Sequence, residues 1–391
     1  MICRIENSQR GQALLFVVLV TSLVLALTTG VLEVAGIHRR NIQYQRQQVQ
    51  AYYIAEAGIE RVIARIREDP RWLDGFGWGR DETVTELTGP YAGGEIRKVT
   101  LHKSADGPGL KIEVTSLGKF VSAQKTLKAT LYYVSVQNLL GGLSLLPPTP
   151  LDLDIRGNFS LMNTGLNRGK LLLNGNLTLS GSAYVDADVY VSGSVEGWDK
   201  IEGQVYTNVR DFPRFPELNL NYYETEARQA GQYYSGNVTL SGTGVYTGVY
   251  YVKGNLTFSG TYSGQATFVV EGDVSIPRDL LPASSYDRIT IICLGDVDIE
   301  NSQVKAIIIA GGTFHAKGNA ELEGALMAQG LNFGGLGIGE GDGESRGGGR
   351  GKGGGGNVTI RYNPQLIELY SLIGVLPQLK ILSWKENYPV F

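Results

Sequence analysis

The hydrophobic pattern of this chain of 391 residues changes character along its length, and each part predicts a different element. Residues 13–32 carry no charge. About twenty helical residues span about 30 Å, the thickness of the hydrocarbon core of a bilayer. The run is longer than the apolar region of a secretory signal, and no clear Ala-x-Ala site follows it. We predict one membrane-spanning helix over about residues 13–36, with a cleaved signal peptide as the alternative.

The helical pattern continues beyond the apolar run instead of breaking. Steps of three and four residues bring six side chains to one face, namely Tyr52, Ala55, Ile59, Val62, Ile63 and Ile66. A single helix over residues 12–68 would be roughly 80 Å long. We expect about half of it to lie in lipid and half to pack against protein.

Basic residues flank the apolar run on both sides, with Arg4 and Arg10 before it and Arg39, Arg40 and Arg46 after it. Counted by the positive-inside rule alone, this balance would keep the large domain in the cytoplasm. The charge balance therefore leaves the orientation open.

Period-two alternation replaces the helical pattern after a loop that contains Pro70, Trp72 and Trp78. Apolar residues alternate with polar ones at Val99 and Leu101, then at Leu110, Ile112 and Val114, and then at Leu127, Ala129, Leu131 and Tyr133. We predict a small antiparallel sheet within residues 69–140, packed on the second half of the helix. Gly141, Gly142 and the prolines at 147, 148 and 150 indicate a linker over residues 141–152.

An internal repeat occupies residues 153–365. Glycine followed by Asn, Asp or Ser and then by alternating apolar residues recurs at Gly157, Gly175 and Gly193, at Gly236, Gly254 and Gly272, and with wider spacing at Gly295 and Gly356. Glycine and Asn tolerate the left-handed backbone of a tight corner, and the apolar residues would point inward from a short strand. About eighteen residues per coil favours a three-sided β-solenoid, which resembles that of bactofilins.

Several segments do not fit the repeat. Residues 198–234 break the register and contain a helical stretch over residues 217–230, so we expect an excursion that covers one face or edge of the solenoid. Residues 334–356 are mostly glycine and predict a loop; Lys352 is followed by Gly353, which argues against a phosphate-binding Walker motif. Residues 366–391 are our candidate for a cap over one end of the solenoid.

Motifs on both sides of the apolar run resemble the N-terminal region of the PilX-like type IV pilus assembly proteins, a set of minor pilins. Arg10 and Gly11 precede the run, and the sequence Ala55-Glu56-Ala57-Gly58-Ile59-Glu60 follows it. The resemblance covers about the first seventy residues. Together with the alternating residues and the repeat, it leads us to expect a fold that is mainly β with a long N-terminal α-helix, in which a pilin-like α+β unit is followed by the β-solenoid.

The same resemblance implies how the chain would be processed. A prepilin peptidase would remove the leader, residues 1–11, by cutting between Gly11 and Gln12, and the new N-terminus would be methylated. Most major pilins carry a glutamate five residues into the mature chain, where this chain has Phe16. The missing carboxylate, which PilX-like proteins and a type II secretion pseudopilin also lack, suggests a special place in the fibre and leaves processing itself open.

Composition narrows the alternatives. The net charge of −3 gives no general attraction to nucleic acid, and the abundance of glycine, 53 residues, suits a fold rich in tight turns. Only Cys3 and Cys293 are present, so removal of the leader would leave Cys293 unpaired, and we expect it to be a buried strand residue. Five Asn-x-Ser/Thr sequences coincide with corners of the repeat and are attributed to its geometry.

Enzymatic chemistry has little support in the sequence. His38, His102 and His315 lie far apart without metal-ligand spacing, so we expect no metal and no cofactor. Some β-solenoids are polysaccharide lyases or hydrolases, and paired carboxylates are conceivable at Asp186 with Asp188, or among Asp273, Asp296 and Asp298. Because Asp273 and Asp296 occupy the corner position of the repeat, we expect them to serve the turn.

The leading hypothesis is a structural subunit without enzymatic activity. It would sit in the bacterial cytoplasmic membrane with its large domain outside, associate with other pilins and with the pilus or secretion machinery, and enter a pilus or pseudopilus. Gly30 and Gly36 would allow close helix approach, and Glu33 would lie at the membrane edge. The alternative is a membrane-anchored surface protein or adhesin whose solenoid binds a carbohydrate or a surface, and a solenoid lyase or hydrolase is a third possibility.

Overall fold

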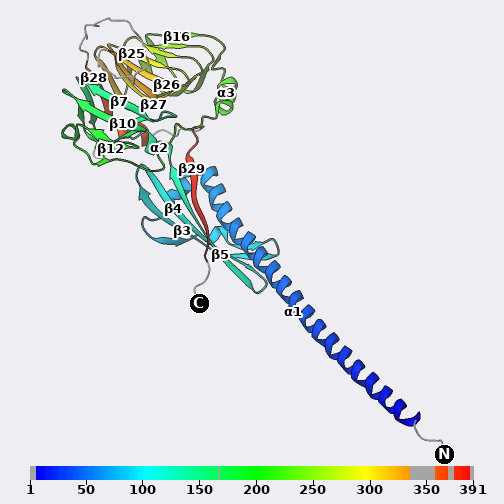
Figure 1. Cartoon of the computed structure of the whole chain (residues 1–391). Coiled ribbons are helices and arrows are strands. Elements are labelled where there is room, and N and C mark those ends of the chain that lie inside the picture. Colours follow the sequence, from blue (N-terminus) through cyan, green and yellow to red (C-terminus); the bar gives the residue numbers. More distant parts are fainter. Residues whose placement is uncertain (1–5, 166–167, 335–356, 369–373, 388–391) are drawn as a thin grey trace, which may run out of the picture. The chain divides into compact units, whose positions relative to one another are not determined.

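The computed structural model describes residues 6–165, 168–334, 357–368 and 374–387. The chain divides into two compact units (Figure 1). The first comprises residues 1–102, 113–130 and 382–391, and the second comprises residues 103–112 and 131–381. The fold is mainly β, preceded by a long N-terminal helix, as the sequence predicts.

Helix α1 (Glu6–Glu68) is uninterrupted, and it begins before the apolar run. The side chains of residues 14–34 are exposed to the surroundings, whereas the last five turns bury a stripe on one side, formed by Ala51, Ile54, Ala55, Gly58, Ile59, Val62, Ile63 and Ile66. This stripe contains the predicted face except for Tyr52, which is half-buried. The two halves of the helix therefore meet different surroundings, as predicted.

The small antiparallel sheet has the strand order β1 (Asp81–Thr83), β3 (Gly94–Asp106), β4 (Gly109–Phe120), β5 (Ala123–Val134) and β29 (Gln378–Asn387), and β2 (Gly89–Tyr91) also pairs with β3. The 3-10 turn η1 (Pro70–Gly75) lies between α1 and β1, and a second one, η2 (Thr85–Leu87), lies between β1 and β2. The alternation that predicted the strands is present in their burial, since Val99, Ile112 and Leu127 are fully buried. The strand β29 belongs to the segment expected to form a cap, and it lies at the edge of this sheet beside β5.

Parallel strands make up the second unit. The strands of the first set are β6 (Gly142–Leu145), β7 (Leu151–Arg156), β8 (Phe159–Asn163), β9 (Gly169–Leu173), β10 (Gly175–Ser180), β11 (Tyr184–Val185), β12 (Ala187–Val191), β13 (Val195–Glu196) and β14 (Val205–Tyr206). The short helix α2 (Val136–Leu139) precedes them, and the 3-10 turn η3 (Trp198–Lys200) lies between β13 and β14. Strand β6 is buried along its whole length, so the predicted linker over residues 141–152 is wrong in part. Four residues between a glycine pair and a proline cluster were too few for the alternation to be recognised.

A connecting segment that contains α3 (Leu220–Gln229) leads to a second set of parallel strands. Its members are β15 (Tyr233–Tyr234), β16 (Val238–Leu240), β17 (Thr243–Val245), β18 (Gly248–Val252), β19 (Leu256–Phe258), β20 (Gly260–Ser263), β21 (Gln265–Val270), β22 (Val274–Ile276), β23 (Leu280–Pro282), β24 (Arg288–Cys293), β25 (Val297–Glu300), β26 (Gln303–Lys317), β27 (Ala320–Gly334), β28 (Val358–Tyr362) and then α4 (Pro364–Glu368). Cys293 is fully buried at the end of β24, as predicted.

The register of these strands carries the sequence repeat. Val238 pairs with Leu256, and Leu256 pairs with Val274, so partners lie one repeat of eighteen residues apart. In the first set, Leu171 pairs with Val189 in the same way. Wider steps, such as Val274 with Val297, mark the places where the sequence carries insertions.

The two sets of strands stack in an order that differs from their order in the chain. Strand β28 pairs with β27 on one side and with β8 on the other, and β6 lies in the same way between β27 and β9. The first set therefore continues the stack where the second set ends, and β12 and β16 lie toward opposite ends of it (Figure 1). Residues 207–232 connect these two ends; the excursion predicted at residues 198–234 is therefore shorter than expected, because β14 and β15 at its margins pair within the two sets of strands.

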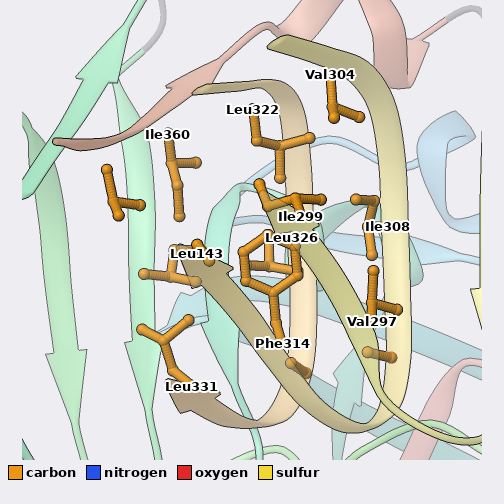
Figure 2. Packing of buried hydrophobic residues seen from close by; sticks show 14 of the residues in the cluster. Leu143, Val297, Ile299, Val304, Ile308, Phe314, Leu322, Leu326, Leu331 and Ile360 are labelled. Carbon is orange, nitrogen blue, oxygen red and sulfur yellow. The ribbon is translucent and has the colours of Figure 1, made fainter. Parts of the chain in front are cut away.

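The two sets of strands meet where β27 pairs with β6 and β28 pairs with β8, and we call this junction the seam. The core of the second unit is continuous across the seam. Figure 2 shows Leu143 of the first set packed among residues of the second set, including Leu326, Ile360 and Phe314. All four side chains are fully buried. Burial of this apolar surface, at about 25 cal/mol per Å², holds the two sets together as one body.

Candidate functional site

The long helix is the first candidate site, because it is apolar enough to cross a membrane. Among the described residues, one helical segment, Leu14–Glu68, has the length and apolar composition that such a span requires, and its most apolar window is not buried within the protein. Leu14, Leu25 and Val31 are each about two-thirds exposed. This surface is a candidate membrane anchor, since apolar patches of this size are rare in contact with water.

Polar side chains within the apolar segment are satisfied by the helix itself. The hydroxyl of Thr28 donates to the carbonyl oxygen of Val24 at 2.6 Å, and the hydroxyl of Thr21 donates to that of Val17 at 2.8 Å. Ser22 and Thr29 make equivalent bonds to Leu19 and Ala26. An unsatisfied hydroxyl would oppose insertion into lipid, so these bonds make the segment compatible with a bilayer.

The remaining predicted residues of this region lie along the same helix. Gly11 and Gln12 fall in its first turns. Phe16 is two-thirds exposed, Glu33 is also exposed, and a Cβ built at Gly30 or at Gly36 would meet no atom within 4 Å. The chain itself therefore leaves the space around these glycines open.

Residues 55–60, which carry the family motif, form the contact between α1 and the small sheet. A Cβ at Gly58 would lie 2.2 Å from the hydroxyl oxygen of Ser116 on β4 and 3.2 Å from a methyl carbon of Ile96 on β3. Conversely, a Cβ at Gly118 would lie 2.4 Å from the carbonyl oxygen of Ala51. Small residues on both surfaces let the helix backbone approach the strands closely.

The acidic residues of this motif lie outside the contact. Glu56 is half-buried, and Glu60 is exposed. Next to them, Arg61 donates to the carbonyl oxygen of Leu87 at 3.2 Å and lies over the ring of Tyr91, 5.1 Å from its centroid. Ala55, Gly58 and Ile59 therefore account for the packing, and the structure gives the two glutamates no comparable role.

The predicted corners of the repeat form hydrogen-bonded ladders along the stack. The side-chain oxygen Oδ1 of Asn237 accepts from the backbone N–H of Asn255 at 2.9 Å. In the same way Asn255 accepts from Asp273, Asp273 from Asp296 and Asp296 from Thr313. In the first set of strands, Asn176 accepts from Ser194 at 2.7 Å. Each side chain thus binds the backbone at the corresponding position of the next repeat.

The ladders explain why glycine precedes the Asn or Asp. A Cβ at Gly254 would lie 2.3 Å from Oδ1 of Asn237, and the corresponding distances at Gly193, Gly272 and Gly295 are 2.1 to 2.2 Å. Only Gly157 and Gly175 among the predicted corners have the left-handed or mirror-region φ that we expected, at 99° and 149°. For Gly193, Gly254, Gly272 and Gly295, space for the neighbouring side chain is the reason, whereas a Cβ at Gly236 would meet no atom within 4 Å. Gly356 lies outside the described residues.

A second ladder was missed in the sequence. Oδ1 of Asn301 accepts from the N–H of Asn319, and Oδ1 of Asn319 accepts from that of Asn357, both at 3.2 Å. Asn301 and Asn319 are one repeat of eighteen residues apart, and Gly318 precedes Asn319. This spacing was the available signal, but no apolar-x-apolar sequence of the expected form follows Asn301.

The carboxylates and histidines considered for catalysis have structural contacts. Asp273 and Asp296 belong to the corner ladder, and Asp296 lies 3.6 Å from the ring of His315. Asp298 lies 4.0 Å from Lys317, and Asp188 accepts from the N–H of Gln204. Asp186 lies 3.5 Å from Arg168, and His102 is 2.8 Å from Asp81. His38 is exposed on α1.

Comparisons with known proteins give a distant likeness. No family model matches the sequence, and no curated protein matches it. Among solved structures, the competence-associated pilin ComZ from Thermus thermophilus is similar at 15% sequence identity and a TM-score of 0.37, with 87% of this chain and 97% of that chain covered. A TM-score of this size describes a remote resemblance, so the functional argument rests on the residues of this chain.

Proposed function

We propose that this protein is a minor pilin-like structural subunit of a type IV pilus or pseudopilus, inserted in the membrane by its N-terminal helix. The observation that carries the proposal is the division of α1. One uninterrupted helix leaves its first half bare and apolar, and packs its second half on an antiparallel sheet through Ala55, Gly58 and Ile59. Such a helix can pass from lipid into a helical bundle without refolding.

The head of this subunit is, in this proposal, a three-sided β-solenoid. Strands β16, β17 and β18 pair in turn with β19, β20 and β21, which supports three strands in each repeat of eighteen residues. The inward side chains of these strands, such as Leu256, Tyr262 and Phe268, belong to one buried cluster. The head would project outside the cytoplasm, and a PilX-type position in the assembly fits the motif at residues 55–60.

The proposed mechanism is association rather than catalysis. The bare half of α1 would pack against the helices of other pilins, and the open space at Gly30 and Gly36 supports close approach of a neighbouring helix. Phe16 in place of the usual glutamate would set this subunit apart from the major pilins, for example at the tip or in an initiating complex. Partners in this scheme are other pilins, the assembly machinery and the prepilin peptidase.

Maturation in the bacterial host provides the test. We expect mass analysis to find a mature chain that begins with methylated Gln12, and a Gly11→Val substitution to leave the leader attached while the protein still reaches the membrane. A matched Gly30→Val variant, altered within the same helix, should still be cut. An intact Met1 in the unsubstituted protein would contradict the pilin assignment and favour the membrane-anchored binding protein.

A further inference from the structure

At one end of the stack, two strands of the last coil have a neighbour on one side only within the described residues. This end coil, residues 233–252, comprises β15, β16, β17 and β18; β15 pairs with β18, whereas β16 and β17 pair with the next coil alone, through β19 and β20. Its inward residues Val238 and Leu240 are half-buried, whereas their partners Leu256 and Phe258 are fully buried. The outer edge of β16 is therefore an open strand edge above an uncovered part of the core.

The corner of the end coil contains a space that is filled in the coils above it. At Gly254, Gly272 and Gly295, the place of a Cβ is taken by the side-chain oxygen of the preceding coil's Asn or Asp. At Gly236 no atom of the described chain lies within 4 Å of that place. Gly236 is also absent from the residues with positive φ, so its backbone does not require glycine. We call this place the Gly236 slot.

The end coil lacks the charges that usually protect a strand edge. No Asp, Glu, Lys or Arg occurs within residues 229–252, although charged residues and proline commonly prevent edge-to-edge pairing. The opposite end of the stack differs, because Glu196, Asp199, Lys200 and Glu202 lie within or next to its last strands and its 3-10 turn. The two ends are therefore built differently, and only the end coil is uncharged.

We propose that the end coil binds an extended strand of a partner protein, which pairs in parallel with β16 and places an Asn or Asp side-chain carbonyl in the Gly236 slot. Apolar residues at the first and third positions after this Asn or Asp would cover Val238 and Leu240. The coils of the stack define this chemistry, since each supplies such a segment to the next one. Strand addition to an open edge is a known mode of peptide recognition.

A second copy of this chain does not supply the required group. At the opposite end of the stack, the backbone N–H of Asn208 bonds to the carbonyl oxygen of Gly193, which is the bond made by the corner glycines Gly193, Gly272 and Gly295. The last corner at this end is irregular, because the N–H of Val209 bonds to the carbonyl oxygen of Val191, as Ser192 does to Leu173 one repeat earlier, and Asn208 has a φ of 52°. Asn208 is followed by Val209 and, at the third position, by Asp211, so this end does not offer an Asn or Asp with apolar residues at both positions, and we infer that the occupant is a different protein. This surface is separate from the apolar half of α1, and the proposal does not rest on the proposed function.

The test uses the full chain in detergent micelles and a fluorescent peptide with the sequence of residues 233–247, the segment that lies next to β19 and β20 in the stack. We expect saturable binding by fluorescence anisotropy, and a Gly236→Ala substitution should weaken it by about tenfold or more because its Cβ fills the slot. A peptide with Asn237→Ala should bind equally weakly. Gly75→Ala, at another glycine with nothing within 4 Å, is the matched control and should bind normally.

Thermal unfolding of the Gly236→Ala variant should match that of the unsubstituted protein, because the added methyl group meets no neighbour in the chain. Absence of peptide binding, or binding that Gly236→Ala leaves unchanged, would overturn the proposal. Self-association of the full chain in analytical ultracentrifugation that Gly236→Ala abolishes would also overturn it, since the occupant would then be a second copy.

Discussion

At the scale of single residues, the corner ladders place the glycines at 193, 254, 272 and 295 beside a side chain of the preceding repeat. The oxygen of Asn255 occupies the space beside Gly272 and accepts the N–H of Asp273 at 3.0 Å. A methyl group at Gly272 would lie 2.1 Å from that oxygen, so the Asn255 side chain would have to leave and its hydrogen bond would be lost. The glycine and the amide therefore act as a pair across two coils.

We predict that Gly272→Ala lowers the free energy of unfolding by about 1–3 kcal/mol, through overpacking and the loss of this hydrogen bond. Urea denaturation of the full chain in detergent would measure the change. Gly236→Ala is the control, since the same substitution at the same repeat position meets no atom within 4 Å. Equal effects of the two substitutions would contradict the ladder as the reason for the glycine.

Gly58 is a second position at which the absence of a Cβ allows close packing. The Ser116 hydroxyl that would lie 2.2 Å from a Cβ at Gly58 is fully buried and has no hydrogen-bond partner among the described residues. We predict that Gly58→Ala destabilises the first unit by about 1–3 kcal/mol, and that adding Ser116→Ala recovers most of the loss. Ser116→Ala alone should be neutral or stabilising, because it removes an unsatisfied buried oxygen.

A thermal unfolding series of these three variants would check that coupling, with Gly36→Ala as a helix control whose Cβ meets nothing. Additive effects in the double variant would show that the two residues do not share the space. The sequence showed the glycine as part of a motif. It could not show the reason, because Ser116 lies on a strand that only the fold brings next to the helix.

At the scale of elements, a charged network crosses β26, β27 and the end of β28. Lys305 lies 2.9 Å from Oε1 of Glu323, and the amide of Asn363 donates to the same oxygen at 2.7 Å. Burial would raise the pKa of Glu323, but the hydrogen bonds from Lys305 and Asn363 and the charges of Lys305 and Arg361 outweigh it and lower the pKa below its ordinary value of 4.5. The ionised glutamate thus ties adjacent strands of the stack.

The sign of the pH dependence follows from this lowered pKa. The stabilisation by Glu323 is present above pH 4.5, the ordinary value, and is lost as the pH falls through the lower pKa of the folded state. We predict that Glu323→Gln reduces the loss of unfolding free energy between about pH 7 and about pH 3, measured by urea denaturation. Glu300→Gln, at an exposed residue of β25, is the control. An unchanged acid dependence in Glu323→Gln would refute the network's role.

Elements with long periodic patterns were predictable, and short or distant ones were not. The helix over residues 12–68 and the strands around Val99, Ile112 and Leu127 each repeat their pattern over several turns or residue pairs. Strand β6 has four residues and no such repetition. The strand β29 has an edge position beside β5, a place that depends on pairing with residues more than two hundred positions earlier.

At the scale of the whole molecule, the repeat predicted the spacing of the paired parallel strands and not their order in space. Most repeats offer their neighbour a similar Gly-Asx corner and similar inward aliphatic residues, so the sequence of one repeat does not identify the repeat that lies next to it. The order is fixed instead at the seam, where Ile360 of β28 pairs with Leu161 of β8. Residues 207–232, which connect the two ends of the stack, look in the sequence like a local interruption.

The stacking order can be tested with pairs of cysteines. Ser160 on β8 and Thr359 on β28 are direct partners in the parallel register, and both side chains are half-buried and reachable by solvent. We predict that the Ser160→Cys/Thr359→Cys variant, with Cys3 replaced by Ser and the buried Cys293 kept, forms an intramolecular cross-link with a short bismaleimide. Its mobility on a denaturing gel should shift, because the link closes a loop of about half the chain.

A stack that follows chain order predicts a different pair. It would place the last strand of the first set, β14, next to the first strand of the second set, β15, so that cysteines at Tyr206 and Tyr234 would be joined instead. Both tyrosines are exposed, at 40% and 39%, and a failure to react would therefore reflect their separation rather than their burial. Cross-linking of the 206/234 pair without that of the 160/359 pair would refute the seam, and with it the assignment of residues 207–232 as the connection between two free ends.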